Sequence, residues 1–185
     1  LIGGFLKKIE NLDKAAIRIL HHLTGLNNIY MEQVYAFSKV NRDPAERTIS
    51  VAYYALIDIA THDKELLKQN PIQWFNLKNA PKLIFDHNRM VEKAMARLRR
   101  RALSKPIGFE LLPEKFTMRQ LQKLYEAILD TKLDKRNFIN KFNSLDILIK
   151  LDEKDMSSSK KGAYLFEFDE EKYNLKVEAG FNFKI

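Results

Sequence analysis

The sequence has no cysteine in its 185 residues, so it can form neither a disulfide framework nor a thiolate metal site. It also lacks any apolar run approaching the roughly 20 residues that cross a bilayer. The apolar start at residues 1–5 is too short for a signal peptide, and no charged flank precedes it. We therefore expect a cytoplasmic protein without a membrane partner.

Acidic residues are the scarcer charge, with 24 against 32 basic residues and a net charge of +8. This balance favours a polyanionic partner, but it is a weak signal alone because many soluble proteins are basic. The 45% hydrophobic and 30% charged residues are typical of a globular chain rather than a disordered one. At this length the chain can hold one ordinary domain or two small ones.

The first 26 residues keep the spacing of a catalytic motif but lack its metal-binding glutamates. The motif is the Nudix box, G-x5-E-x7-R-E-U-x-E-E-x-G-U with U aliphatic, and the matching positions are Gly4, Glu10, Arg18 and Gly25. In the box, helical glutamates hold Mg²⁺ or Mn²⁺, which prefer oxygen ligands, against a diphosphate. Three of these glutamates are replaced here, by Ile19, His22 and Leu23. The sequence therefore predicts a Nudix fold without metal ligands or catalytic residues, suited to sensing.

Two adjacent histidines, His21 and His22, lie inside the same motif. Neighbouring positions on a helix point about 100° apart, so the two imidazoles cannot easily share one metal ion. We expect one exposed and one packed histidine rather than a replacement metal site. The alternative function is a Nudix hydrolase acting on ADP-ribose or another nucleoside diphosphate sugar.

The N-terminal half alternates between helical and extended patterns. Apolar residues recur at spacings of three and four across residues 11–23, which predicts a helix that ends at Gly25. Residues 29–37 and 48–59 predict two strands, and the second is almost continuously apolar, as is typical of a strand buried on both faces. A further helix is predicted from about residue 86 to residue 104.

The pattern changes after Pro106, where we place a domain boundary. A capping-box signature at Thr117 opens a helix, and a second helix follows over residues 134–145. Strands at 147–151 and 163–168 then enclose a loop rich in Ser and Lys. Helix, short turn, helix and a hairpin with a basic tip is the order of a winged helix-turn-helix.

The predicted helix at 134–145 carries a polar face that suits DNA. No acidic residue follows Asp134 on this face, and Arg and Asn make bidentate contacts to guanine and adenine edges. Lysines on this helix and at the hairpin tip suit phosphates. The candidate DNA-contacting residues are Arg119, Lys135, Arg136, Asn137, Asn140, Lys141, Lys160 and Lys161. A solvated polar face without a ligand is the competing interpretation.

The basic run Arg97–Arg101 is less specific. It suits a patch that contacts phosphates. It equally suits a linker helix whose long side chains lie along apolar surface at a subunit interface. The sequence leaves these two interpretations open.

Taken together, the motifs resemble the Nudix-related transcriptional regulators of bacteria, in which a Nudix-type domain precedes a C-terminal winged helix. The resemblance extends over almost the whole chain, and its supporting segments are 3–5, 47–54, 85–87, 111–117, 121–129 and 134–138. It implies an α+β protein with a partial Nudix-like α/β/α sandwich at 1–85, a connecting helix at 86–105 and a winged helix-turn-helix domain at 106–185. Because such regulators carry strands upstream and the sequence has no initiator Met, we expect it to begin inside a longer chain.

The resemblance also implies a homodimeric repressor or activator that binds double-stranded operator DNA and needs no cofactor. A small effector, either a pentose or phosphosugar or an ADP-ribose-like nucleotide, is expected to bind the Nudix domain and alter the affinity for DNA. Losing the box glutamates removes metal contacts to a diphosphate, which favours the sugar-type effector and a role in sugar metabolism. Candidate effector-contacting residues are Phe5, Lys7, Glu10, Arg47 and Tyr53. A protein-binding adaptor is a further alternative, distinguished by equal affinity for operator and random DNA.

Overall fold

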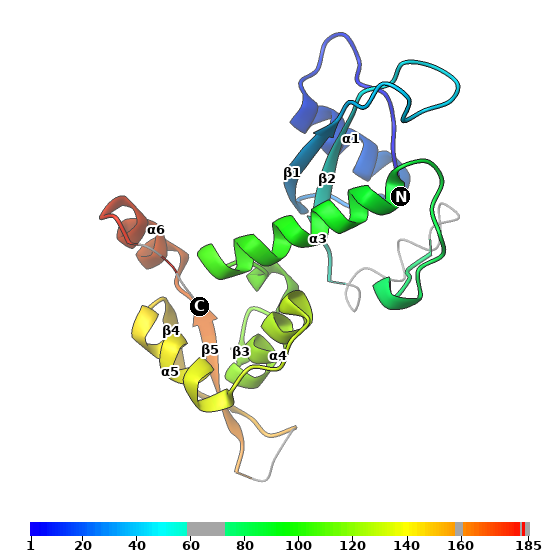
Figure 1. The fold of residues 1–185 in the computed structure, drawn as a ribbon. Helices are drawn as coiled ribbons and strands as arrows, with labels where there is room; N and C mark the ends of the chain where they lie inside the picture. Colours follow the sequence, from blue (N-terminus) through cyan, green and yellow to red (C-terminus); the bar gives the residue numbers. More distant parts are fainter. Residues whose placement is uncertain (59–72, 158–160, 182, 184–185) are drawn as a thin grey trace. The chain divides into compact units, whose positions relative to one another are not determined.

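The computed structural model describes residues 1–58, 73–157, 161–181 and 183. The chain divides into two compact units, an N-terminal unit, Leu1–Arg97, and a C-terminal unit, Leu98–Ile185. The division falls inside helix α3, His87–Ser104, which Figure 1 draws in green. Lys160 and the end of the strand predicted at 48–59 lie outside the described residues. Within the described ranges, no helix is both long and apolar enough to cross a bilayer.

The N-terminal unit begins with helix α1, Leu12–Thr24, close to the predicted bounds. The Asn11 side chain caps it by accepting a hydrogen bond of 2.9 Å from the Lys14 amide. Gly25 ends it in the left-handed conformation at φ 74°, with its N–H donating to the His21 carbonyl. The predicted helix and its glycine C-cap are therefore confirmed.

Strands β1, Tyr30–Phe37, and β2, Ser50–Leu56, form an antiparallel pair in which Tyr30 lies opposite Leu56. Both strands were predicted, but the prediction that β2 is buried on both faces was wrong. Leu56 is the only buried residue of β2, and the rest of the strand is half-buried. The described part of this sheet has just two strands, so among the described residues β2 pairs with a neighbour along one edge only, and its side chains are less enclosed than those of a central strand.

The two faces of this sheet are bound by different helices. Tyr53 donates to Asp13 of α1 at 2.7 Å, whereas the adjacent Tyr54 donates to Glu32, which is bound by Arg97 of α3. Successive side chains of a strand point to opposite faces. The sheet therefore lies between α1 and the first part of α3, in the predicted α/β/α order (Figure 1).

The C-terminal unit has the predicted winged helix-turn-helix order. Its elements are η2 (Phe109–Leu111), β3 (Phe116–Thr117), α4 (Met118–Leu129), α5 (Lys135–Leu145), β4 (Leu148–Asp155), β5 (Ala163–Phe168) and α6 (Glu170–Glu178). The sheet of this unit has the strand order β3-β5-β4. In the N-terminal unit, a short helix η1, Leu77–Asn79, precedes α3. The short strand β3 and the helix α6 were not predicted.

The core of the C-terminal unit lies between its helices and its sheet. Its most deeply buried large side chains are Tyr125, Phe116, Phe142, Leu121 and Ile147. Ala102 of α3 is also completely buried in this cluster, and Arg99 donates to the Ile128 carbonyl at 3.2 Å. The last turns of α3 therefore pack within the winged-helix unit, while its first turns belong to the N-terminal unit.

Candidate functional site

Helix α5 is held in place by its cap and by its apolar side. The Asp134 side chain accepts a hydrogen bond of 2.8 Å from the Asn137 amide. Phe138, Phe142 and Leu145 are each at most 4% exposed, and the two phenylalanine rings lie 4.7 Å apart between centroids. Because these residues fix the rotation of the helix, the opposite face is turned to solvent.

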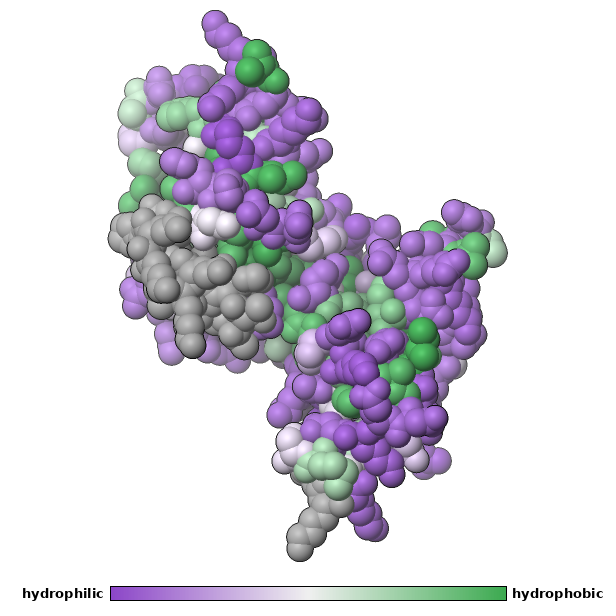
Figure 2. Space-filling model, turned by 180° about the vertical axis from the view of Figure 1, so that it is seen from behind, coloured by the Kyte–Doolittle hydropathy of each residue, from purple (hydrophilic) through white to green (hydrophobic). Residues whose placement is uncertain are grey.

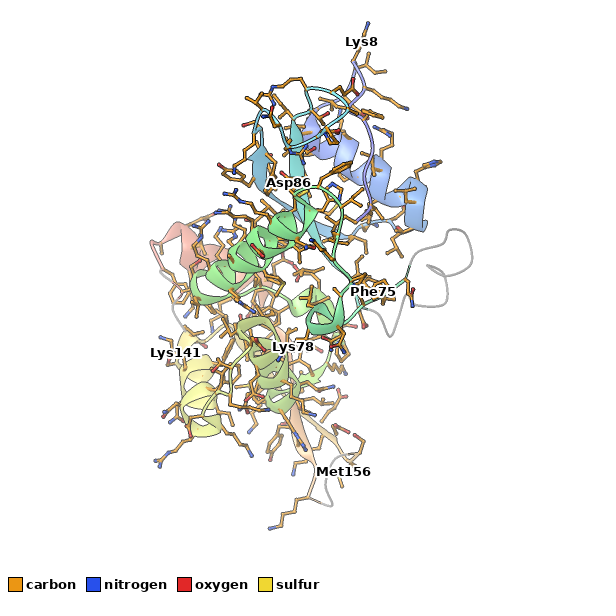
Figure 3. All side chains as sticks on the ribbon, turned by 45° about the vertical axis from the view of Figure 1, so that its right-hand side comes forward. Lys8, Phe75, Lys78, Asp86, Lys141 and Met156 are labelled. Carbon is orange, nitrogen blue, oxygen red and sulfur yellow. The ribbon has the colours of Figure 1, made fainter. Side chains whose placement is uncertain are left out.

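That exposed face carries the side chains predicted to read DNA, and we call α5 the reading helix. Lys135, Arg136, Asn137 and Asn140 are exposed, and Lys141, labelled in Figure 3, is half-buried. Within the described ranges, the side chains of these five residues form no ion pair and no hydrogen bond. Their donors are therefore available to an external partner, in the residue types that recognise bases and phosphates.

The predicted flanking contacts lie on two other elements. Arg119 is exposed in the first turn of α4, and Lys161 is exposed just before β5. Gln120 and Thr117 complete both bonds of the predicted capping box, at 2.7 Å and 3.2 Å, so the start of α4 is fixed. The side chains of Arg119 and Lys161 are both cations of the kind that bind phosphates.

The arginine run on α3 is in part internally bound. Arg97 forms an ion pair of 2.7 Å with Glu32, and Arg99 binds the Ile128 carbonyl and lies 3.9 Å from Asp130. Arg97 therefore binds within the N-terminal unit, and Arg99 binds within the C-terminal unit. For Arg97 and Arg99 the structure favours an anchoring role over a phosphate patch.

In the Nudix-box segment, Glu10 and Arg18 bind each other through two hydrogen bonds of 2.9 Å and 2.5 Å. Arg18 also donates to the Phe5 carbonyl, and Glu10 accepts from the Lys7 amide at 2.8 Å. The pair therefore ties the loop at residues 5–10 to α1. Glu10 and Arg18, two of the four retained positions of the box, therefore maintain its shape.

The carboxylate of Glu10 gives this tie a pH dependence. The hydrogen bonds from Arg18 lower the pKa of Glu10 from its ordinary value of 4.5 to about 2. The pair stabilises the folded protein fully at pH values above the pKa that Glu10 has in the unfolded chain. This stabilisation is lost as the pH falls towards the folded pKa of about 2. We expect Glu10→Gln to remove part of the loss of stability between pH 5 and pH 2, measured as urea midpoints. A variant with the native acid dependence would show that the pair contributes nothing.

The positions of the missing glutamates are apolar or solvent-exposed. Ile19 packs on Gly4, where an added Cβ would lie 3.0 Å from the Ile19 side chain. His21 and His22 are both exposed, so the prediction that one would be packed was wrong. The buried stripe of α1 runs through Ala15, Leu20 and Thr24, and both histidines fall outside it. No cluster of metal-binding side chains occurs in the part of the chain that the structure describes.

Four of the candidate effector-contacting residues lie around the start of α1. Phe5 is 88% exposed and Lys7 is exposed on the loop that Glu10 holds. Tyr53 reaches the first turn of α1 through Asp13, and burial together with this bond raises the pKa of Tyr53 to about 12. Arg47 is different, because it donates to the Lys39 and Thr48 carbonyls of the β1–β2 loop. Among the described residues, no hydrogen bond brings Arg47 to the other four.

Two polar clusters of the N-terminal unit escaped the sequence analysis. Arg42, with its side chain 4% exposed, binds Asp86 at 2.7 Å and 3.0 Å and Ser50 at 2.7 Å. Glu32 accepts hydrogen bonds from Tyr30, Tyr54 and Arg97, and burial followed by the Glu32 bond raises the pKa of Tyr54 well above its ordinary value. Strand alternation predicts that Tyr30 and Glu32 share one face of β1, but it does not predict that Arg97 of α3 binds Glu32.

Comparison with known proteins relates both units to one group of regulators. A family model described as the NrtR DNA-binding winged helix domain matches residues 108–168. The chain is 31% identical over 179 residues to the ADPR responsive transcriptional repressor NtrR of Acinetobacter baylyi, spanning 95% of this chain and 71% of that protein. It is also 29% identical over 96 residues to the ADP-ribose pyrophosphatase of Methanocaldococcus jannaschii, spanning 51% of this chain and 56% of that protein.

Solved structures show the same fold. Shewanella oneidensis NrtR, in a crystal structure with a 27mer DNA, is similar with a TM-score of 0.81 at 24% identity, over 97% of this chain and 81% of that chain. A MutT/nudix family protein from Enterococcus faecalis has a TM-score of 0.64 at 20% identity, over 91% of this chain and 73% of that chain. The predicted architecture, a Nudix-like domain followed by a winged helix, is confirmed.

Proposed function

Because this chain belongs to the NrtR-type family of Nudix-related transcriptional regulators, we propose that it is a repressor whose affinity for operator DNA is controlled by ADP-ribose. Membership of this family makes the protein an effector-responsive DNA-binding regulator. One observation carries the DNA-binding part of the proposal. The reading helix is capped and packed on one side, and it presents Arg136, Asn137 and Asn140 to solvent without an acidic side chain among them.

The roles on the winged helix follow from the chemistry of each side chain. Arg136 and Asn137, in the first turn of the reading helix, are proposed to contact base edges in the major groove, together with Asn140. Lys135, Lys141 and Arg119 are proposed to bind the flanking phosphates. Lys161, and Lys160 outside the described residues, are proposed to contact the backbone from the hairpin.

ADP-ribose replaces the sugar-type effector that the missing glutamates favoured. The support is the similarity, over 95% of this chain, to a repressor described as ADPR responsive. The exposed Phe5 ring offers a stacking surface for adenine, and the exposed Lys7 and Arg47 offer cations for a diphosphate. Tyr53 is proposed to contact the ribose, while Glu10 acts by holding the loop through Arg18.

Sensing rather than cleavage is supported by Ile19, His22 and Leu23. A Nudix hydrolase needs converging carboxylates to hold its metal, and these side chains supply none. The likeness to an ADP-ribose pyrophosphatase covers about half of each chain, so it supports the ligand more than the reaction. We propose that the N-terminal unit binds ADP-ribose without hydrolysing it.

A homodimer in the cytoplasm would bring two winged helices to one operator. Its support is the exposed apolar surface of the N-terminal unit, which includes Ile9 at 94%, Ile84 at 65% and Ile49 at 62% exposure. Figure 2 shows such hydrophobic side chains at several places on one face. Half-sites separated by about one DNA turn, roughly 34 Å, would fit one spacing of the two reading helices. To change this spacing, the effector must bind the two states of the dimer with affinities that differ by about 1–3 kcal/mol.

The proposal is tested with the purified full chain and a labelled duplex from the region upstream of its own gene. We expect tighter binding to this duplex than to a scrambled one at 0.15 M salt, and a change of about 5- to 150-fold in affinity on adding ADP-ribose. In parallel, ADP-ribose is incubated with the protein and Mg²⁺ or Mn²⁺, and we expect no release of AMP. Equal affinity for both duplexes would favour the adaptor, and steady AMP release would favour the hydrolase.

A further inference from the structure

The hairpin of β4 and β5, which we call the wing, carries two lysines on one aromatic ring. The ammonium group of Lys150 lies 3.8 Å from the centroid of the Tyr164 ring, and that of Lys154 lies 4.6 Å from it. All three residues are exposed, with Tyr164 at 43%. Two cations held at one ring repel each other, so the arrangement is suited to an anion that binds both.

An irregularity in the strand pairing brings the two lysines together. Lys154 lies opposite Tyr164 and Lys150 lies opposite Phe166, so a step of four positions along β4 matches a step of two positions along β5. In a regular antiparallel pair, positions so far apart would not reach one ring. The shift in register between Lys150 and Lys154 shortens their separation along the hairpin.

Strand alternation places this cluster on a defined face of the wing. Tyr164, Phe166 and Phe168 share one face of β5, and Phe166 and Phe168 pack against the helical core of the C-terminal unit. Tyr164 is the next residue of that face towards the start of β5. Met156, at the far end of the same hairpin, is labelled in Figure 3. The two lysines therefore lie on the face of the sheet that the helices of this unit pack against.

The carboxylates of the wing do not neutralise the pair. Glu153 is bound by Lys115 at 2.5 Å, and Asp155 accepts a hydrogen bond of 2.8 Å from the Ser157 amide. Glu167 lies opposite Ile149, on the other face of the sheet from Lys150. Asp152, the remaining carboxylate of β4, is exposed, where solvent screens its charge.

We propose that Lys150 and Lys154, positioned by Tyr164, form a phosphate-binding site of the wing that holds the DNA backbone beside the reading helix. This inference rests on the proposed DNA-binding function and adds a site to it. The ring holds the two flexible side chains near their bound positions, so less conformational freedom is lost on binding. Because the contacts are to phosphate, they strengthen binding to every sequence equally.

The test measures binding to operator and scrambled duplexes over a range of salt concentrations. Replacing Lys150 and Lys154 together by Gln should reduce the slope of log affinity against log salt by about 1.8 for each winged helix bound, since each phosphate contact contributes about 0.9. Both duplexes should lose affinity by the same factor. The matched control replaces Lys14 and Lys82, both exposed in the N-terminal unit, by Gln and should leave the slope nearly native.

Variants of the ring separate charge from positioning. Tyr164→Leu keeps both lysines and should weaken all duplexes about two- to fivefold with little change in slope, whereas Tyr164→Phe should bind as the native chain does. An unchanged slope in the lysine double variant, with sequence-specific binding of the native protein intact, would overturn this site alone. Absence of sequence-specific binding by the native protein would overturn the proposed function as well.

Discussion

Replacing Asp86 by Ala is expected to lower the free energy of unfolding of the N-terminal unit by about 3 kcal/mol. The cost arises at Arg42, whose side chain is only 4% exposed and would retain its charge without a carboxylate beside it. We use the lower end of the range for broken buried pairs because the Asp86 side chain is 21% exposed. The same bond joins the β1–β2 loop to the residue that precedes α3, so its loss also loosens the start of that helix.

Two further variants separate the lost charge from the lost contact. Asp86→Asn keeps an acceptor oxygen and should cost less than Asp86→Ala. Replacing Arg42 by Met together with Asp86 by Leu removes both charges and should recover most of the stability. Urea unfolding gives the size of each loss, and hydrogen exchange locates it in β1, β2 and the first turns of α3. If the urea midpoint of Asp86→Ala equals that of the native protein, the pair contributes no more to stability than an exposed ion pair does.

Features set by neighbouring residues were predictable from the sequence. The cap at Asn11, the left-handed Gly25 and the capping box at Thr117 each involve residues within a few positions of one another. The same holds for the reading helix, because the stripe of Phe138 and Phe142 determines which face is exposed. Local hydrogen bonds and helical periodicity are therefore enough to give these elements and the orientation of α5.

Features that depend on distant partners were not predictable. The Arg42–Asp86 pair joins residues 44 positions apart, and nothing in either local sequence marks the other. The cluster on the wing depends on a register shift between Lys150 and Lys154, which a regular two-residue alternation does not reveal. Burial of β2 was overestimated for a related reason, since how completely a strand is enclosed depends on elements far away in the sequence, and α1 and α3 leave most of β2 half-buried.

The other large expected effect lies on the reading helix. Arg136→Ala should weaken operator binding by about 1–3 kcal/mol, roughly 5- to 150-fold, and should reduce the preference for operator over scrambled DNA. Arg136 is exposed at the second position of α5, and among the described residues no carboxylate binds it. Its planar guanidinium can therefore make two parallel hydrogen bonds to a guanine edge. Anisotropy titrations with a panel of single-base operator variants measure the loss at each position.

Comparison with a lysine at the same site identifies the kind of contact. Arg136→Lys keeps the charge but loses the two-pronged geometry, so discrimination should fall while the salt dependence stays nearly native. Lys161→Ala, on the wing, should instead weaken all duplexes by a similar factor and lower the salt slope by about 0.9. An Arg136→Ala variant that loses affinity equally for every duplex would assign Arg136 to the backbone and sequence reading to another residue. Asn137 and Asn140, which share the exposed face, are then the residues to test by the same titration.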